Sequence, residues 1–269
     1  MTANSGYPQR IVCLTEETTE TLYLLGEEQR IVGISGFTVR PSRARREKPR
    51  VSAFTSARIA RIVGLSPDLV LGFSDLQADI AAELVRAGLN VHVFNQRSVA
   101  EILAMIRTLG GMIGCEAKTA ALLEELEGGL AAVRAAAGTL GARPRVYFEE
   151  WDEPLISGIG WVSELIGLAG GEDCFAELAR QSLGRNRIIA DPLEVVRRAP
   201  DIVLGSWCGK KFRPGQVGSR PGWSAIPAVR SGFVREIKSA IILQPGPAAL
   251  TDGVRALQAV ISEWAATQA

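Results

Sequence analysis

Short apolar strands alternate with helical segments along almost the whole chain. The strand patterns lie at residues 10–14, 30–34, 69–73, 91–94, 145–150, 201–206 and 234–239. Helical spacing fills residues 16–25 and 76–87 in the first half, and the chain closes with a helical pattern over 247–266. Alternation of this kind predicts an α/β fold whose sheets are central and parallel, with helices as crossovers.

One short motif occurs once in each half of the chain. SPDLVLG at residues 66–72 returns as APDIVLG at residues 199–205. A helix is expected to end before each proline and a strand to follow each aspartate, because proline stops helices and aspartate suits turns. Open parallel sheets bind ligands outside the carboxyl ends of their strands. The repeat therefore predicts two Rossmann-like lobes that present such edges to each other across a ligand cleft.

The midpoint carries one long helical pattern. Residues 116–140 are rich in Ala, Leu and Glu, which are strong helix formers. A helix of this length spans roughly 37 Å. It would hold two lobes more rigidly than a linker of Gly and Ser. We expect an N-terminal α/β lobe over residues 1–115, a connecting helix over 116–140 and a C-terminal α/β lobe over 141–269.

Charge and hydropathy exclude two classes of partner. The net charge of +1 predicts no nucleic-acid surface. No apolar run reaches the length of a bilayer, so no membrane span is expected. The first residues lack the basic start and apolar stretch of a secretory signal. As written, the chain is expected in the cytoplasm, or in the periplasm if a signal has been removed.

The basic run RPSRARREKPR, from Arg40 to Arg50, is the strongest local concentration of charge. We expect a solvated loop there, with anion binding or docking of a partner as the alternative. The single histidine, His92, lies in a strand pattern and is expected to be a packed strand residue rather than a ligand.

The four cysteines are expected to be thiols rather than disulfides, because their spacings are wide and none forms a CxxC pair. Cys208 is the one placed for chemistry. Lys210 and Lys211 beside it would lower the pKa of its thiol, and a thiolate can ligate cobalt or iron. A small loop residue without chemistry is the alternative.

Large aromatic residues follow four of the expected strands, where the backbone leaves the core. They are Phe37, Phe73, Trp151 and Trp207. An aromatic-walled cleft for a large flat ligand would use such rings, since each supplies much buried area. Ordinary packing of loop aromatics is the alternative.

Several segments resemble the cobalamin- and siderophore-binding proteins of ABC importers, with the cobalamin-binding branch closest. The segments are RIVGLSPDLVLGF (61–73), YFEEWDEPLISGIGWVSELIGLAGGEDCF (147–175), VVRRAPDIVLGS (195–206) and the central helix. The resemblance implies two Rossmann-like lobes joined by a rigid helix, with the ligand between them. It also implies a non-enzymatic substrate-binding protein, for which a corrinoid would be the ligand and not an intrinsic cofactor.

In the cobalamin-binding branch, aromatic residues of both lobes hold the corrin ring. The resemblance places Phe37, Phe54 and Phe73 at the first-lobe positions, without the hydroxyl and indole donors of the family. We expect arginines and a lysine at the rim, including Arg187. The predicted ligand-binding set is Phe37, Arg40, Phe54, Phe73, Trp151, Trp207, Cys208, Lys210, Arg213, Trp223 and Gln244, with Cys208 also a candidate axial metal ligand.

The resemblance further implies docking on an ABC permease through one glutamate of each lobe. Ala60 and Leu193 stand at those positions here, with Glu194 one residue away, which weakens the expectation of a permease partner. The expected ligand is a corrinoid, heme or siderophore. The alternative is a cytoplasmic corrinoid or tetrapyrrole carrier, sensor or processing enzyme that kept the receptor fold and uses Cys208 or Glu150.

Overall fold

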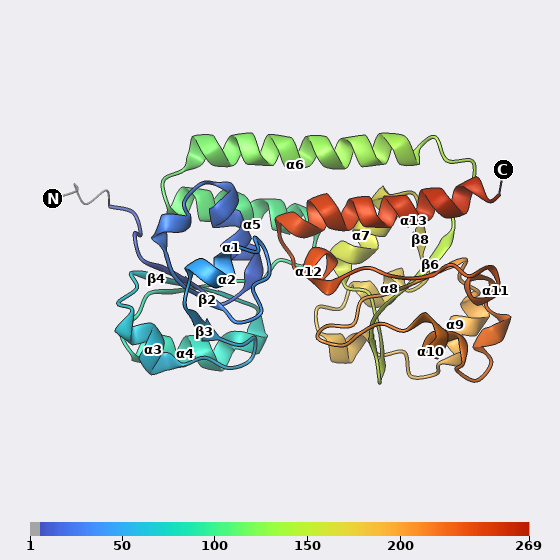
Figure 1. The fold of residues 1–269 in the computed structure, drawn as a ribbon, viewed down its shortest axis with the longest axis horizontal. Coiled ribbons are helices and arrows are strands. Elements are labelled where there is room, and N and C mark those ends of the chain that lie inside the picture. The colour runs from blue at the N-terminus through green and yellow to red at the C-terminus, as the bar shows by residue number, and fades with distance from the viewer. Residues whose placement is uncertain (1–5, 269) are drawn as a thin grey trace. The chain divides into compact units, whose positions relative to one another are not determined.

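The structure is a computed structural model that describes residues 6–268 and divides into two units (Figure 1). Unit 1 runs to Gln96 and continues over Ala100–Leu126, and unit 2 contains Arg97–Val99 and Glu127–Ala269. The boundary at Leu126 falls inside helix α6 (Glu116–Ala137), the segment predicted as the connecting helix. The predicted α/β architecture is confirmed.

Unit 1 is built on a five-stranded sheet in which every pairing is parallel. The strand order is β3-β2-β1-β4-β5, so the order reverses between β1 and β4. Strand β3 was not predicted, because it is only three residues long and begins with an exposed arginine. The strands are β1 (Ile11–Cys13), β2 (Ile31–Ser35), β3 (Arg50–Ser52), β4 (Leu69–Phe73) and β5 (Val91–Phe94).

Helices cover both faces of the unit 1 sheet. Residues of α3 and α4 share one apolar cluster with β1, β3 and β4, and α5 lies on the opposite side of the sheet (Figure 1). Buried apolar runs in the strands require this double cover. The helices are α1 (Glu16–Leu24), α2 (Ala44–Glu47), α3 (Ile59–Gly64), α4 (Ala78–Arg86), α5 (Val99–Met112) and α6, with 3₁₀ turns at Glu28–Arg30 and Asp75–Gln77.

Unit 2 has a mixed sheet of order β10-β9-β6-β7, with β8 also paired to β6. Among the pairings of these unit 2 strands within residues 6–268, β6 with β7 is antiparallel and the others are parallel. This hairpin departs from the expected all-parallel sheet, because β6 extends past the predicted residue 150 and turns back. The strands are β6 (Arg145–Asp152), β7 (Leu155–Ser157), β8 (Glu172–Asp173), β9 (Ile202–Gly205) and β10 (Val234–Glu236).

The helices of unit 2 are mostly short. The final helix begins with a π-helical turn at Ala249–Gly253 and packs against α7. Among residues 6–268, no helix combines the length and apolarity needed to cross a bilayer. The helices are α7 (Gly160–Leu168), α8 (Ala176–Ala179), α9 (Leu193–Arg198), α10 (Pro214–Gly218), α11 (Pro227–Ser231), α12 (Ser239–Ile242) and α13 (Val254–Ala266), with 3₁₀ turns at Gly184–Arg187 and Trp223–Ala225.

The repeated Pro-Asp motif makes the same contact in both units, which we call the aspartate clasp. Asp68 Oδ1 accepts a 2.9 Å hydrogen bond from the Arg10 backbone amide, and the Asp68 amide donates back to the Arg10 carbonyl at 2.9 Å. Asp201 exchanges the equivalent two bonds with Arg145, both at 2.8 Å. The clasp thus joins the start of β4 to β1 and the start of β9 to β6.

The residue before each proline takes the same unusual backbone conformation. Ser66 has φ 46° and Ala199 has φ 44°, both in the left-handed region. This turn ends the preceding helix and lets the proline and aspartate enter the next strand. The two copies of the motif therefore encode the same helix-to-strand connection, once in each unit.

Candidate ligand-binding surfaces

Phe37 stands on a loop that is fastened to helix α1. The Val39 amide donates a 2.7 Å hydrogen bond to Glu16 Oε1, and Arg40 Nε lies 2.8 Å from Glu20 Oε1. Phe37 lies just before these two anchored residues, and it is 57% exposed. The Phe37 ring is therefore accessible for contact with a ligand, as are other exposed apolar side chains such as Leu76. Arg40, which was predicted to lie at the rim of the site, is the residue that pairs with Glu20.

Gln77 joins two of the other predicted aromatic positions. Its side-chain oxygen accepts from the Phe73 amide at 2.9 Å, and its nitrogen donates to the Phe54 carbonyl at 2.9 Å. Phe54 is half-buried, whereas Phe73 is only 5% exposed and pairs in register with Phe94. The structure therefore keeps Phe54 at the surface and places Phe73 in the core. Sequence analysis missed Gln77, which organises both.

The amino end of α1 is rich in buried carboxylates. Glu16, Glu17 and Glu20 are all buried. Burial raises the pKa of Glu16 to about 7 and that of Glu17 to about 7. The Thr15 hydroxyl donates to Glu17 Oε1 at 2.5 Å, while Glu17 Oε2 is buried and has no hydrogen-bond partner. Glu16, whose pKa is raised in this way, is also the residue that holds the Phe37 loop through the Val39 amide.

In unit 2, a fully buried carboxylate organises the end of β6. Glu149 receives hydrogen bonds of 2.6 and 2.9 Å from Arg220, of 3.0 Å from Trp207 Nε1 and of 3.0 Å from the Tyr147 hydroxyl. A buried charge needs such compensation. Nothing in the sequence pairs these four residues, since they come from three separate segments.

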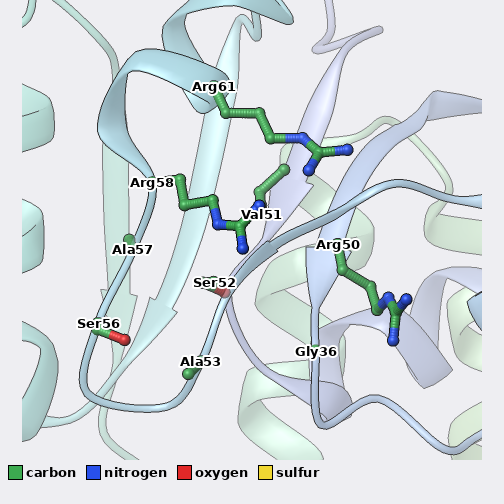
Figure 2. Close-up of a pocket in the computed structure, with 9 residues that line it drawn as sticks. All are labelled: Gly36, Arg50, Val51, Ser52, Ala53, Ser56, Ala57, Arg58 and Arg61. Carbon is green, nitrogen blue, oxygen red and sulfur yellow. The ribbon is translucent and has the colours of Figure 1, made fainter.

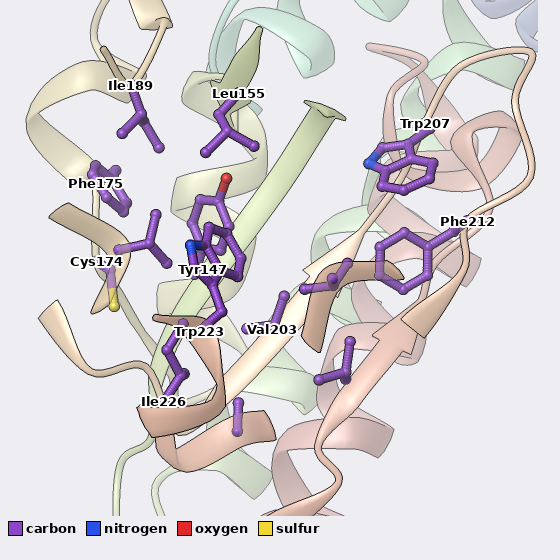
Figure 3. Packing of buried hydrophobic residues seen from close by; sticks show 14 residues of the cluster. Tyr147, Leu155, Cys174, Phe175, Ile189, Val203, Trp207, Phe212, Trp223 and Ile226 are labelled. Atoms are coloured by element: carbon purple, nitrogen blue, oxygen red, sulfur yellow. The ribbon is translucent and has the colours of Figure 1, made fainter. Parts of the chain in front are cut away.

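Trp207 and Trp223 are core residues of unit 2 (Figure 3). Trp207 is 3% exposed and packs edge-on against Phe212, and Trp223 is 0% exposed and packs edge-on against Tyr147. A ring without accessible surface cannot stack on a ligand. The structure therefore contradicts the prediction that Trp223 contacts the ligand. It leaves Trp207 with little surface through which to contact one.

Trp151, Lys210 and Cys208 gather at one surface of unit 2. Lys210 Nζ lies 2.5 Å from Asp152 Oδ2, 5.7 Å from the centre of the Trp151 ring and 5.1 Å from that of Trp207. Trp151 is half-buried and its indole donates to the Glu153 carbonyl at 2.9 Å. Cys208 is exposed, whereas the other three cysteines are buried thiols. Lys210 therefore joins Trp151 to the loop that also carries Cys208, and their contact with a ligand stays a prediction.

The remaining predicted rim residues have different environments. Arg213 precedes α10 and lines an open cavity of about 740 Å³ together with Lys211. Gln244 is half-buried and follows α12, so a helix separates it from the last strand. Arg187 is not at a rim. It is 1% exposed and holds Glu150 through two hydrogen bonds of 2.6 and 3.0 Å.

The two positions matched to docking glutamates are both at the surface. Ala60 is exposed on α3, and Leu193 is 47% exposed at the start of α9. The neighbouring Glu194 is engaged by Arg197 and Arg198 of its own helix.

His92 packs edge-on against Phe94, and no cluster of three metal-ligating side chains occurs within residues 6–268.

The periplasmic binding protein family matches residues 11–241, and the chain belongs to this family. It is 29% identical over 200 residues to the cobalamin-binding protein of Halobacterium salinarum, a match that covers 73% of this chain and 53% of that protein. The chain therefore spans about half the length of this relative. The vitamin B12-binding protein of Vibrio parahaemolyticus is 24% identical over 246 residues, covering 90% of this chain and 86% of that protein.

The fold is shared with solved binding proteins. The periplasmic heme-binding protein RhuT of Roseiflexus sp. RS-1 superimposes with a TM-score of 0.78 at 22% identity, covering 94% of this chain and 99% of that structure. The resemblance drawn from the sequence, to the binding proteins of cobalamin and siderophore importers, is confirmed at the level of the family.

Proposed function

We propose that this protein is the substrate-binding component of an ABC importer and that it carries a corrinoid or another large tetrapyrrole. The observation that carries the proposal is the exposed Phe37 ring on a fastened loop at the strand ends of unit 1. The two relatives, a cobalamin-binding protein and a vitamin B12-binding protein, favour a corrinoid. The heme-binding structural neighbour supports a tetrapyrrole as the wider class.

The geometry around Phe37 suits a flat apolar ligand. Glu16 and Glu20 hold the loop from α1, and Gln77 holds the neighbouring Phe54 segment. A surface fixed before binding loses little conformational freedom when the ligand arrives. Each ring then contributes buried apolar area, at about 25 cal/mol per Å².

On unit 2, we propose Trp151 and Lys210 as ligand contacts and Cys208 as an axial ligand of the bound metal. Arg40, Arg213 and Gln244 remain predicted polar contacts. We propose binding without turnover, because a binding protein is what the family name describes. The processing-enzyme alternative predicts a chemically altered corrinoid after incubation, and the binding proposal predicts recovery of the unaltered ligand.

An ABC permease is the partner proposed for this function, and the periplasm is the compartment that the family name suggests. The docking surface would differ from a pair of glutamates, because Ala60 is uncharged and Glu194 is already paired.

The test is a visible absorption titration with aquocobalamin, cyanocobalamin and hemin. We expect a saturable spectral shift at one ligand per chain with at least one of them. A further change that is lost in Cys208→Ser would identify the axial ligand, and Cys174→Ser, a change at a buried thiol, is the matched control. No saturable shift with any of the three would contradict the proposed function.

A further inference from the structure

Unit 1 contains a basic cavity that the predicted site did not include. It has a volume of about 540 Å³ and is lined by Gly36, Arg50, Ser52, Ser56, Arg58 and Arg61 among others. Figure 2 shows Arg58 and Arg61 projecting from the α3 side and Arg50 projecting from β3 on the Gly36 side. No carboxylate lines the cavity within the described chain.

The three guanidinium groups have no acidic partner among the described residues. Arg50, Arg58 and Arg61 make no side-chain hydrogen bond or ion pair to any residue between 6 and 268. By contrast, Arg43, from the same basic run as Arg50, pairs with Glu28 at 2.9 Å. All three arginines are exposed, so water screens their mutual repulsion, and their donors are accessible to an anion in the cavity.

A serine hydroxyl adds a polar group that lacks a partner. Ser52 Oγ is buried and has no hydrogen bond to any described residue. Because this oxygen has almost no accessible surface, it belongs to the wall of the cavity and does not itself contact a ligand. The inference therefore rests on the arginines and on the aromatic residues beside them.

The backbone of the cavity is already fixed. The Ala53 amide donates to the Ser56 carbonyl at 2.8 Å, and the Arg58 amide donates to the Val51 carbonyl at 2.9 Å. The Gly36 amide donates to the Ser52 carbonyl at 2.7 Å, and a Cβ at Gly36 would lie 3.1 Å from that oxygen. These bonds tie the turn between β3 and α3 to the end of β2.

We propose that this cavity is an anion-binding subsite that receives a carboxylate or phosphate group of the carried ligand. The inference rests on the proposed function and narrows its ligand class to corrinoids or tetrapyrroles with an acidic side arm. Gly36 directly precedes Phe37 and Ala53 directly precedes Phe54, so the cavity shares its loops with the two surface aromatics. A ring on the aromatics would bring its acidic arm to the arginines.

The chemistry of the lining fits such an arm. Arginine donates in a planar fork that matches carboxylate and phosphate oxygens, and hydrogen bonds between charged groups are stronger than neutral ones. A concave site favours a small acidic group over a flat acidic protein surface. Neutral amide or ester arms would leave all three charges uncompensated.

The experiment compares ligands with and without an acidic arm. Hemin is paired with its dimethyl ester, which differs only in the two carboxylates, and cyanocobalamin is paired with dicyanocobinamide, which lacks the whole nucleotide arm with its phosphate, ribose and base. The variant is R58Q/R61Q, and the control is Arg46→Gln, an exposed arginine outside the cavity. We expect the double variant to raise the Kd of the acidic member by about tenfold or more, and to leave the neutral member and the control within about twofold.

The outcomes separate this inference from the proposed function. If acidic and neutral members bind the wild-type protein equally, the subsite is overturned while ligand binding stands. If no ring binds at all, the proposed function fails and calorimetric titration with pyrophosphate decides the subsite. Pyrophosphate binding that R58Q/R61Q abolishes would support an anion site for a free phosphate, and no pyrophosphate binding would overturn it.

Discussion

Trp207 donates its indole hydrogen bond to Glu149 across 3.0 Å, and neither residue reaches solvent appreciably. The carboxylate is held in turn by Arg220, whose guanidinium also lies 4.5 Å from the centre of the Trp223 ring. One buried charge therefore positions two of the tryptophans that the sequence suggested as ligand walls. We therefore expect these two indoles to stabilise the core of unit 2.

Replacing Arg220 leaves the buried Glu149 carboxylate without its opposite charge, although the hydrogen bonds from Trp207 and Tyr147 remain. Arg220→Met is expected to lower the free energy of unfolding by about 3–5 kcal/mol. The control is Lys238→Met, because Lys238 is 69% exposed and its pair with Glu236 is expected to contribute within about 1 kcal/mol. Urea denaturation measures both, and equal losses in the two variants would contradict the assignment.

Phe37 and Trp223 should respond to truncation in opposite ways. Phe37→Ala removes an exposed ring, so we expect a ligand Kd about tenfold higher with stability changed by less than about 0.5 kcal/mol. Trp223→Ala empties a buried site and should cost about 3–5 kcal/mol of stability. Absorption titration and urea unfolding check the pair. Wild-type affinity in Phe37→Ala would remove Phe37 from the binding surface.

Two adjacent glycines of α5 provide a matched test of helix packing. A Cβ at Gly110 would lie 1.9 Å from Thr119 Oγ1 of α6, whereas a Cβ at Gly111 would meet nothing within 4 Å. Gly110→Ala is expected to destabilise by about 1–3 kcal/mol through overpacking. Gly111→Ala should stabilise by about 0.5–1 kcal/mol, because alanine favours helix. Thermal unfolding that shifts in the same direction for both would refute this packing.

The buried carboxylates of α1 predict a pH dependence. Burial raises the pKa of Glu16 and of Glu17 from 4.5 in the unfolded chain to about 7 in the folded protein. Between these values the folded state binds more protons, so the contribution of these groups to stability is fully present below about pH 4.5 and is lost as the pH rises through about 7.

Glu17→Gln tests this linkage, since glutamine keeps an oxygen for the Thr15 hydroxyl and does not ionise. Relative to wild type, the variant should gain stability at about pH 8 and little at about pH 5. Glu124→Gln, at an exposed position of α6, is the control. Urea unfolding with the same pH slope in wild type and Glu17→Gln would contradict the prediction.

The fold could be predicted because its signals are local. The strands β1, β2, β4, β5, β6 and β9 are runs of apolar residues, and the Pro-Asp motif marks the same connection twice. Strands β3, β7 and β8 were missed, because these two or three residues lie outside any longer apolar run of the kind that marked the equally short β1. The predicted helix over residues 116–140 ends at Ala137.

The site was less predictable because its geometry depends on distant partners. An aromatic after a strand can turn outward, as Phe37 does, or inward, as Trp207 does. What decides for Trp207 is Glu149, 58 residues earlier in the chain. The basic cavity escaped for the same reason, since Arg50 joins Arg58 and Arg61 only after β3 and α3 fold together.

The aspartate clasp also bears on how fast the two halves form. It closes a loop of 58 residues between Arg10 and Asp68 and one of 56 residues between Arg145 and Asp201. The entropy lost on closing a flexible loop grows only with the logarithm of its length, so the two closures are nearly equal in cost. Loop length therefore favours faster folding of neither half. The order of folding then depends on which sheet first packs against its helices.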